Sequence, residues 1–90
     1  MKFDWHDKKA ETNEAKHGVS FEEAREVFYD PNAKILPDDE HSWEEQRMRI
    51  YGATRRRLLT VIYVEIIEDY IWIISAREMT KREKRLYYEN

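Results

Sequence analysis

The sequence predicts an α+β domain in which helices pack on one antiparallel sheet. Residue spacing is helical between about residues 7 and 29 and again after residue 80, whereas the segments between alternate with a period of two. Short turn-like segments join the alternating stretches, and strands joined in this way pair antiparallel. The expected order is β-α-α-β-β-β-β-α, within one domain covering residues 1–90.

The first elements are a short strand and a helix. "KFDW" at 2–5 alternates and is a candidate edge strand. Helical spacing follows from about Asp7 to His17 and places three polar residues on one side: Lys9, Asn13 and Lys16. Gly18 is the expected end of this helix, because glycine adopts the left-handed conformation at little cost.

The second helix has its own start and stop signals. Ser20 and Glu23 have the spacing of a capping box. The apolar stripe consists of Phe21, Ala24, Val27 and Phe28. "DP" at 30–31 ends the helix, since the residue before proline avoids helical geometry.

Four further strands and a helix complete the expected order. The strands are "AKIL" at 33–36, "QRMRIYG" at 46–52, "LLTVIYVE" at 58–65 and "YIWIISAR" at 70–77. The strand at 58–65 follows a basic turn. The turn of the last hairpin, near "IIED", contains no glycine. Thr80 and Glu83 form a second capping box, which predicts a C-terminal helix.

Composition narrows the class of protein. The 90 residues include no cysteine, which excludes disulfides and cysteine metal sites and fits a reducing compartment. The longest apolar stretches have seven residues, far short of the roughly 20 that a membrane span needs, and the N-terminus lacks the apolar run of a signal peptide. We therefore expect a soluble cytoplasmic protein.

Charge is unevenly distributed along the chain. Residues 1–46 carry 6 basic and 13 acidic residues, and residues 47–90 carry 10 basic and 6 acidic ones. Either one face of the protein meets phosphates, or the two halves neutralise each other across the fold.

Several kinds of chemistry lack support. The three histidines have spacings that no helix brings together, and "DDEH" at 38–41 is more typical of a solvated turn than of a chelating site, so we expect no metal and no cofactor. The two glycines form no phosphate-binding loop. Nothing supports a Ser–His–Asp arrangement.

Arginines interleaved with aromatic residues are the more informative feature, since this combination binds unpaired RNA bases and their backbone. The expected RNA-binding residues are Lys81, Arg55, Arg56, Arg49 and Tyr51. Trp72 and Tyr63 are either stacking surfaces for bases or core residues, and for Trp72 we favour the core. For Arg77 we favour a functional role, because it ends a strongly apolar strand where the sheet meets solvent.

The chain resembles the BrnT toxins of type II toxin–antitoxin systems. The matching segments are "FDW", "KHGVSFEEA" at 16–24, "VF" followed by "DP", "LLTVIY" and "IISAR" at 73–77, together with Lys9, Ala10, Asn13, "HS" at 41–42, Glu45, Arg47, Gly52 and the closing "TKREKRLYY". The match is collinear and covers nearly the whole chain.

The resemblance implies a RelE-like fold and a ribonuclease that cleaves RNA without a metal and arrests bacterial growth. It also implies a BrnA-type protein antitoxin, in a dimer or heterotetramer with the toxin. Three positions depart from the family pattern: His6 precedes the first helix, Trp72 stands where an arginine is common, and "EIIEDY" lacks glycine.

Metal-free cleavage needs a base, an acid and positive charge at the phosphate. We expect Arg77, Arg47 and Arg82 to supply the charge. Glu45 is a candidate base or a surface carboxylate paired with an arginine, and His41 is a candidate base or acid in an acidic turn.

His17 is a further catalytic candidate, but its place in the last turn of a helix favours structural closure. The alternative to an enzyme is a non-catalytic basic module that binds an antitoxin or nucleic acid. A structural subunit without any site is the least favoured interpretation.

Overall fold

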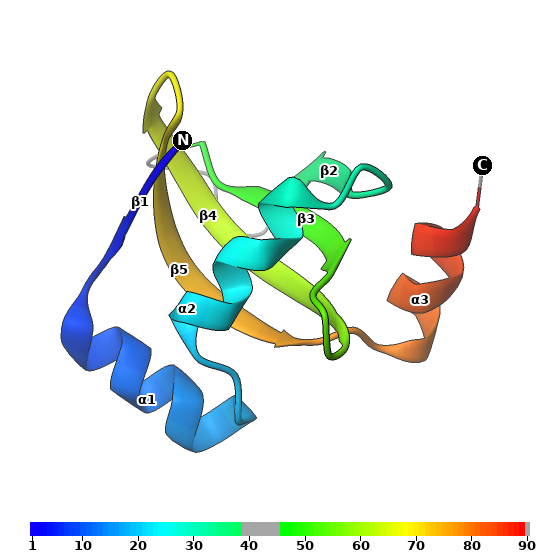
Figure 1. The fold of residues 1–90 in the computed structure, drawn as a ribbon, viewed down its shortest axis with the longest axis horizontal. Helices are drawn as coiled ribbons and strands as arrows, with labels where there is room; N and C mark the ends of the chain where they lie inside the picture. The colour runs from blue at the N-terminus through cyan, green and yellow to red at the C-terminus, as the bar shows by residue number, and fades with distance from the viewer. Residues whose placement is uncertain (39–45, 90) are drawn as a thin grey trace.

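The protein, seen here as a computed structural model that describes residues 1–38 and 46–89, is a five-stranded sheet with helices around it (Figure 1). The elements are β1 (Lys2–Trp5), α1 (Asp7–His17), α2 (Phe21–Ala24), the 3-10 helix η1 (Arg25–Tyr29), β2 (Lys34–Pro37), β3 (Met48–Ala53), β4 (Leu58–Ile67), β5 (Tyr70–Glu78) and α3 (Lys81–Tyr88). This confirms the predicted α+β class and the predicted order of elements.

The sheet has the strand order β1-β5-β4-β3-β2 and is mixed. β2, β3, β4 and β5 pair antiparallel, as predicted. β1 is an edge strand, also as predicted, but it pairs parallel with β5, with Phe3 opposite Ile71. The expectation of a purely antiparallel sheet is therefore wrong at this edge. The first and last strands become neighbours through a long connection rather than a turn, and such a connection permits parallel pairing.

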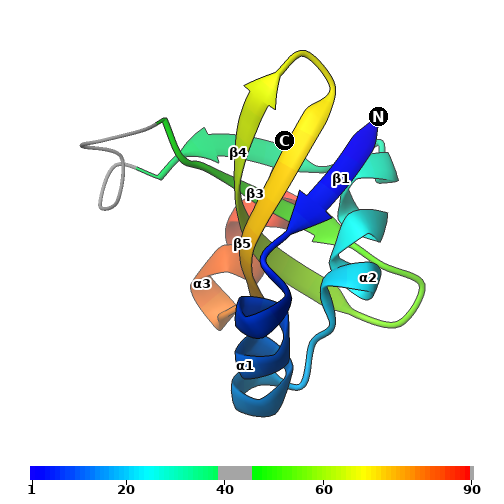
Figure 2. The same cartoon turned by 90° about the vertical axis from the view of Figure 1, so that its left-hand side faces the viewer.

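The main core lies between the sheet and the α2–η1 segment, which covers one face (Figure 2). Its fully buried side chains include Val19, Phe21, Val27, Ile50, Leu59, Val61 and Ile73. Gly52 lets η1 approach β3 closely, because a Cβ atom there would lie 2.7 Å from Val27 Cβ. Tyr63 is buried in this core, which decides between its two possible roles. Trp72, expected in the core, is only half-buried and lies on the opposite face.

On that opposite face, α3 covers one end of the sheet through a smaller cluster of Tyr51, Met79 and Tyr87. Lys34 of β2 binds the end of α3, because its Nζ donates to the Leu86 carbonyl at 2.6 Å and to the Glu89 carbonyl. Tyr87 donates its hydroxyl proton to Asp30 at 2.6 Å, and burial together with this carboxylate raises the pKa of Tyr87 to about 12.

Most of the predicted end signals of the elements are confirmed. Gly18 takes φ 69° at the end of α1, and Ser20 Oγ accepts the Glu23 amide at 3.1 Å. The Glu23 carboxylate does not complete that box, because it binds Arg57 instead. In the last hairpin, which has no glycine, Asp69 supplies the left-handed residue at φ 64°.

Asn13 fixes α1 against the edge of β5. β1 pairs with β5 only as far as Ile73, and beyond that point Asn13 takes the place of a neighbouring strand. Its amide donates to the Ala76 carbonyl at 2.8 Å and to the Val19 carbonyl at 3.0 Å, and its Oδ1 accepts the Ala76 amide at 3.1 Å. Asn13 is the buried residue of α1, whose Ala10 and His17 are half-buried and whose other side chains are exposed. A polar side chain therefore orients α1.

We expect Asn13→Ala to lower the free energy of unfolding by about 2–3 kcal/mol, because it leaves buried backbone groups of Val19 and Ala76 without partners. For a chain of this size the melting temperature should fall by roughly 10–20 °C. Thr12→Ala is the matched control, since the Thr12 hydroxyl makes an exposed bond within the helix. Equal melting temperatures for the two variants would contradict this role of Asn13.

Candidate functional site

The face of the sheet that α3 only partly covers carries a row of polar side chains. Tyr51, Thr60 and Arg77 lie opposite one another on β3, β4 and β5. Arg49 and Ser75 point to the same side one step along the strands, because alternate residues share a face. We call this surface the arginine face.

Glu83 of α3 holds Arg77 in a fixed position on this face. Arg77 Nη1 donates to Oε1 at 2.7 Å, and Nη2 donates to Oε2 at 2.9 Å. The same carboxylate accepts the Thr60 hydroxyl at 2.8 Å and the Thr80 amide at 3.0 Å, which completes the predicted capping box of α3. Two strands and a helix therefore meet at one carboxylate.

The electrostatics follow from these contacts. Burial alone would raise the pKa of Glu83, but hydrogen bonds from Arg77, Thr80 and Thr60 outweigh it and lower the pKa to about 2. The Glu83 partnership raises the pKa of Arg77, although the nearby charge of Arg49 acts against it. The Arg77 side chain is still 36% exposed, so its guanidinium can meet a ligand while Glu83 orients it.

Arg49 is held in a comparable way. Its Nη2 donates to Asp38 at 2.7 Å, and its Nη1 donates to the Tyr51 hydroxyl at 3.4 Å. Asp38 is buried, whereas the Arg49 side chain is 26% exposed. Hydrogen bonds to Tyr51 and Asp38 raise the pKa of Arg49, so this side chain keeps its positive charge.

The other residues that the sequence predicted for the site come from several different parts of the chain. Arg47 is half-buried just before β3, and its carbonyl accepts the Asp38 amide at 2.9 Å. Lys81 and Arg82 are exposed at the start of α3. His17 is half-buried at the end of α1. Two candidates, Glu45 and His41, lie outside the described residues.

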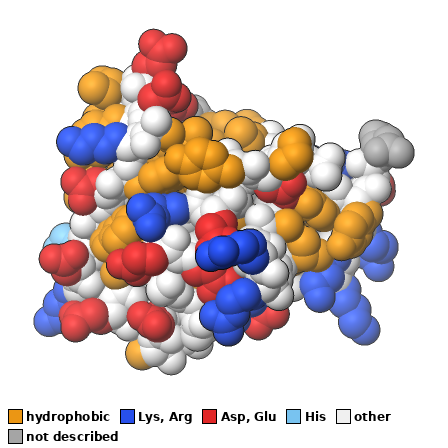
Figure 3. Space-filling model, in the orientation of Figure 1, with side chains coloured by type: hydrophobic (Ala, Val, Ile, Leu, Met, Phe, Trp, Pro, Cys, Tyr) orange, Lys and Arg blue, Asp and Glu red, His pale blue; other side chains and the backbone are white. Residues whose placement is uncertain are grey.

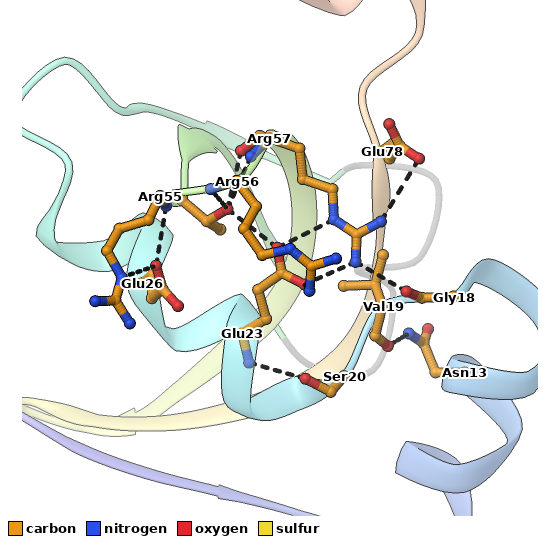
Figure 4. Close-up of polar contacts among 11 residues, drawn as sticks. Asn13, Gly18, Val19, Ser20, Glu23, Glu26, Arg55, Arg56, Arg57 and Glu78 are labelled. Atoms are coloured by element: carbon orange, nitrogen blue, oxygen red, sulfur yellow. Dashed lines mark hydrogen bonds and ion pairs between the residues drawn. The ribbon is translucent and has the colours of Figure 1, made fainter.

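Arg55 and Arg56 lie in the β3–β4 turn, away from the arginine face. They contact carboxylates of the α2–η1 segment: Arg55 approaches Glu26 at 3.8 Å, and Arg56 approaches Glu23 at 4.0 Å (Figure 4). The structure therefore does not bring these two arginines together with Arg77. Their assignment to RNA binding stays a prediction.

Arg57 completes this second cluster and has a structural role. It donates to Glu23 through Nη2 at 2.7 Å and to the Gly18 carbonyl at 2.8 Å (Figure 4).

Figure 3 shows Lys and Arg side chains beside Asp and Glu near the centre of this view. A hollow of about 770 Å³ lies in the same region, and its lining includes three carboxylates and two arginines: Glu22, Glu26, Asp30, Arg25 and Arg55. Because both signs of charge line it, the hollow offers a polyanion no uniformly positive surface.

The sequence pattern alone did not reveal Glu83 and Asp38 as the partners of the site arginines. Glu83 was recognised only as part of a capping box, and Asp38 only as part of an acidic turn. The available signal was that a capping carboxylate comes six residues after an arginine that ends a strand. The pairing itself depends on how α3 turns back onto the sheet.

No three His, Asp or Glu side chains in residues 1–38 and 46–89 are grouped as metal ligands. None of the helices in the described part of the chain is long and apolar enough to cross a membrane.

The model of the family described as "Ribonuclease toxin, BrnT, of type II toxin-antitoxin system" matches residues 5–83. The chain belongs to the BrnT family of type II toxins. A search of curated proteins finds no match. The chain is similar to the 1.1 Å crystal structure of the Brucella abortus ribonuclease toxin BrnT, with 25% identity and a TM-score of 0.70 over 90% of this chain and 99% of that one. The family assignment gives the protein a toxin role, with a protein antitoxin as its partner.

We expect protonation of Glu83 to destabilise the fold in acid. Because the folded-state pKa of Glu83 is depressed, its contribution is complete above the unfolded value of 4.5 and is lost as pH falls toward 2. The loss over this range is about 3 kcal/mol.

Urea unfolding at a series of pH values measures this loss. Glu83→Gln should be less stable than the wild type at neutral pH and should show a flatter dependence on pH below 4.5. Parallel pH profiles for the two proteins would show that Glu83 has an ordinary pKa.

Proposed function

We propose that this BrnT-family protein is a metal-independent endoribonuclease that cleaves RNA in the bacterial cytoplasm and arrests growth. A BrnA-type antitoxin would neutralise it, in a dimeric or heterotetrameric complex. The observation that carries the proposal is the arginine face, where Arg49 and Arg77 lie near each other, each held by a buried carboxylate and each partly exposed. Pre-oriented guanidinium groups are suited to a phosphate that gains negative charge during reaction.

The proposed reaction consists of two proton transfers and one displacement at phosphorus. A base removes the proton of the ribose 2′-hydroxyl, whose oxygen attacks the adjacent phosphorus. The bond from phosphorus to the 5′-oxygen breaks, that oxygen takes a proton from an acid, and the products are a cyclic phosphate and a 5′-hydroxyl. In this proposal Arg77 and Arg49 stabilise the phosphorane, with Arg47 and Arg82 as additional cations.

Glu83 is a poor base in this scheme. With a pKa near 2 and both carboxylate oxygens engaged by Arg77, it has little tendency to take a proton. The proton-transfer roles therefore stay with Glu45 and His41, as the sequence analysis proposed. Lys81, exposed at the start of α3, would bind the RNA backbone. Tyr51, also predicted to bind RNA, is only 3% exposed, and its hydroxyl accepts a hydrogen bond from Arg49, so it would act by orienting that arginine.

A non-catalytic module that binds an antitoxin or nucleic acid is the second candidate. The half-buried Trp72 favours it, because this residue stands on the arginine face at a position where relatives often carry an arginine. Loss of that cation would weaken phosphate stabilisation while leaving a surface on which a base can stack.

An RNA cleavage assay in EDTA separates the two candidates. We expect the purified toxin, free of antitoxin, to cut single-stranded RNA in EDTA, and Arg77→Ala to reduce the rate by about 10²–10³ because one charge-stabilising contact is lost. Arg25→Ala is a matched control, since Arg25 is an exposed arginine on η1. Circular dichroism and thermal melting establish that each variant is folded.

Intact RNA after incubation with folded wild-type protein would reject the enzyme and leave the binding module. Full activity of a folded Arg77→Ala variant would reject the arginine face as the site.

A further inference from the structure

A second basic surface lies beside the arginine face, in a groove between α1 and β5. The groove has a volume of about 450 Å³. Its titratable lining residues are all cationic or histidine: His6, Lys8, Lys9, Lys16 and His17. Ser75 of β5 completes one wall.

The charges of α1 are sorted onto two sides of the helix. Asp7, Glu11 and Glu14 follow one another at i, i+4 and i+7 and therefore share one side. Lys9 and Lys16 are seven residues apart and share another side, with Asn13 between them. A helix stabilised by internal ion pairs would instead alternate the two signs at neighbouring positions.

Asn13 determines where the lysine side points. Because its amide bonds to the backbone of Ala76, the side of α1 that carries Lys9 and Lys16 is turned toward β5. Both lysines are exposed, and neither forms an ion pair within the described part of the chain. Arg57 and Arg77, by contrast, are bound to buried carboxylates.

The groove is continuous with the arginine face through Ser75. Ser75 lines the groove, and it lies two residues before Arg77 on the same face of β5. Figure 2 shows α1 along the lower end of β5, with α3 and α2 on opposite sides of the sheet. A chain that leaves Arg77 along this face therefore reaches the lysine side of α1.

We propose that this groove binds the phosphate backbone of single-stranded RNA next to the nucleotide held by Arg77, with Lys9 and Lys16 as its phosphate contacts. The proposal rests on the proposed ribonuclease function and extends the same site. Seven residues of helix separate the Cα atoms of the two lysines by about 10 Å along the axis, enough for their side chains to contact two separate phosphates. A lysine offers a point charge without geometric preference, which suits binding that does not depend on base sequence.

Binding of a fluorescent, non-cleavable 2′-O-methyl RNA oligonucleotide, measured by anisotropy over a range of salt concentrations, tests the groove apart from catalysis. Each phosphate contact contributes about 0.7 to the slope of log K against log salt for a single strand. The Lys9→Gln/Lys16→Gln variant should therefore have a slope smaller by about 1.4, and bind roughly 20-fold more weakly at about 0.1 M salt.

The control variant is Lys2→Gln/Arg25→Gln, which removes the same charge from exposed positions outside the groove. Its slope of log K against log salt should stay close to that of the wild type, apart from the change that any loss of net charge produces. Equal slopes for both double variants would overturn the proposal. A groove variant that binds RNA normally but binds the antitoxin more weakly would assign the groove to the protein partner, and would equally overturn it.

The outcomes distinguish this inference from the proposed function. If the wild type cuts RNA while the groove variant keeps its slope, only the groove assignment fails. If the wild type neither binds nor cuts RNA, the proposed function fails as well.

Discussion

The Glu83 carboxylate is the interaction on which the arginine face depends. It accepts hydrogen bonds from Arg77 on β5, Thr60 on β4 and the Thr80 amide at the start of α3. A buried carboxylate with this many donors stays ionised, and an ionised carboxylate holds a guanidinium in a fixed, two-point geometry. The contact that attaches α3 to the sheet therefore also positions the cation that we propose acts on the phosphate.

The other side of the sheet uses the same chemistry for stability. Glu23 binds Arg57, and Arg57 also reaches the Gly18 carbonyl at the end of α1, so the β3–β4 turn is attached to both N-terminal helices. This arrangement accounts for part of the uneven distribution of charge along the sequence. Carboxylates of the acidic half pair with arginines of the basic half both here and at Arg49–Asp38, but the guanidinium groups of the arginine face stay partly exposed and can still meet a polyanion.

Local signals in the sequence were sufficient for the elements and most of their ends. Gly18 and Thr80 have strong intrinsic preferences for the positions they occupy, and the alternation of residues 46–52, which predicted a strand, is that of β3, where Arg49 and Tyr51 share one side. These features depend on neighbours in the chain, which a sequence displays directly.

Features that depend on distant neighbours could not be predicted in this way. β1 is the first strand of the chain and β5 is the last, and their parallel pairing joins segments that are far apart in the sequence. The helical spacing of Asn13 with Lys9 and Lys16 did not reveal that Asn13 bonds the edge of β5 beyond the end of β1. The partners of the site arginines, Glu83 and Asp38, were likewise visible only as a cap and a turn, because burial in the folded protein determines which carboxylate an arginine meets.

The central claim is that the reacting phosphate lies on the arginine face. The most direct measurement is a crystal structure of the toxin bound to an RNA oligonucleotide with a 2′-deoxy sugar at the cleaved position, which retains the phosphate but removes the nucleophile. We expect a phosphate within hydrogen-bonding distance of both Arg77 and Arg49. A phosphate bound instead at the β3–β4 turn, beside Arg55 and Arg56, would contradict it.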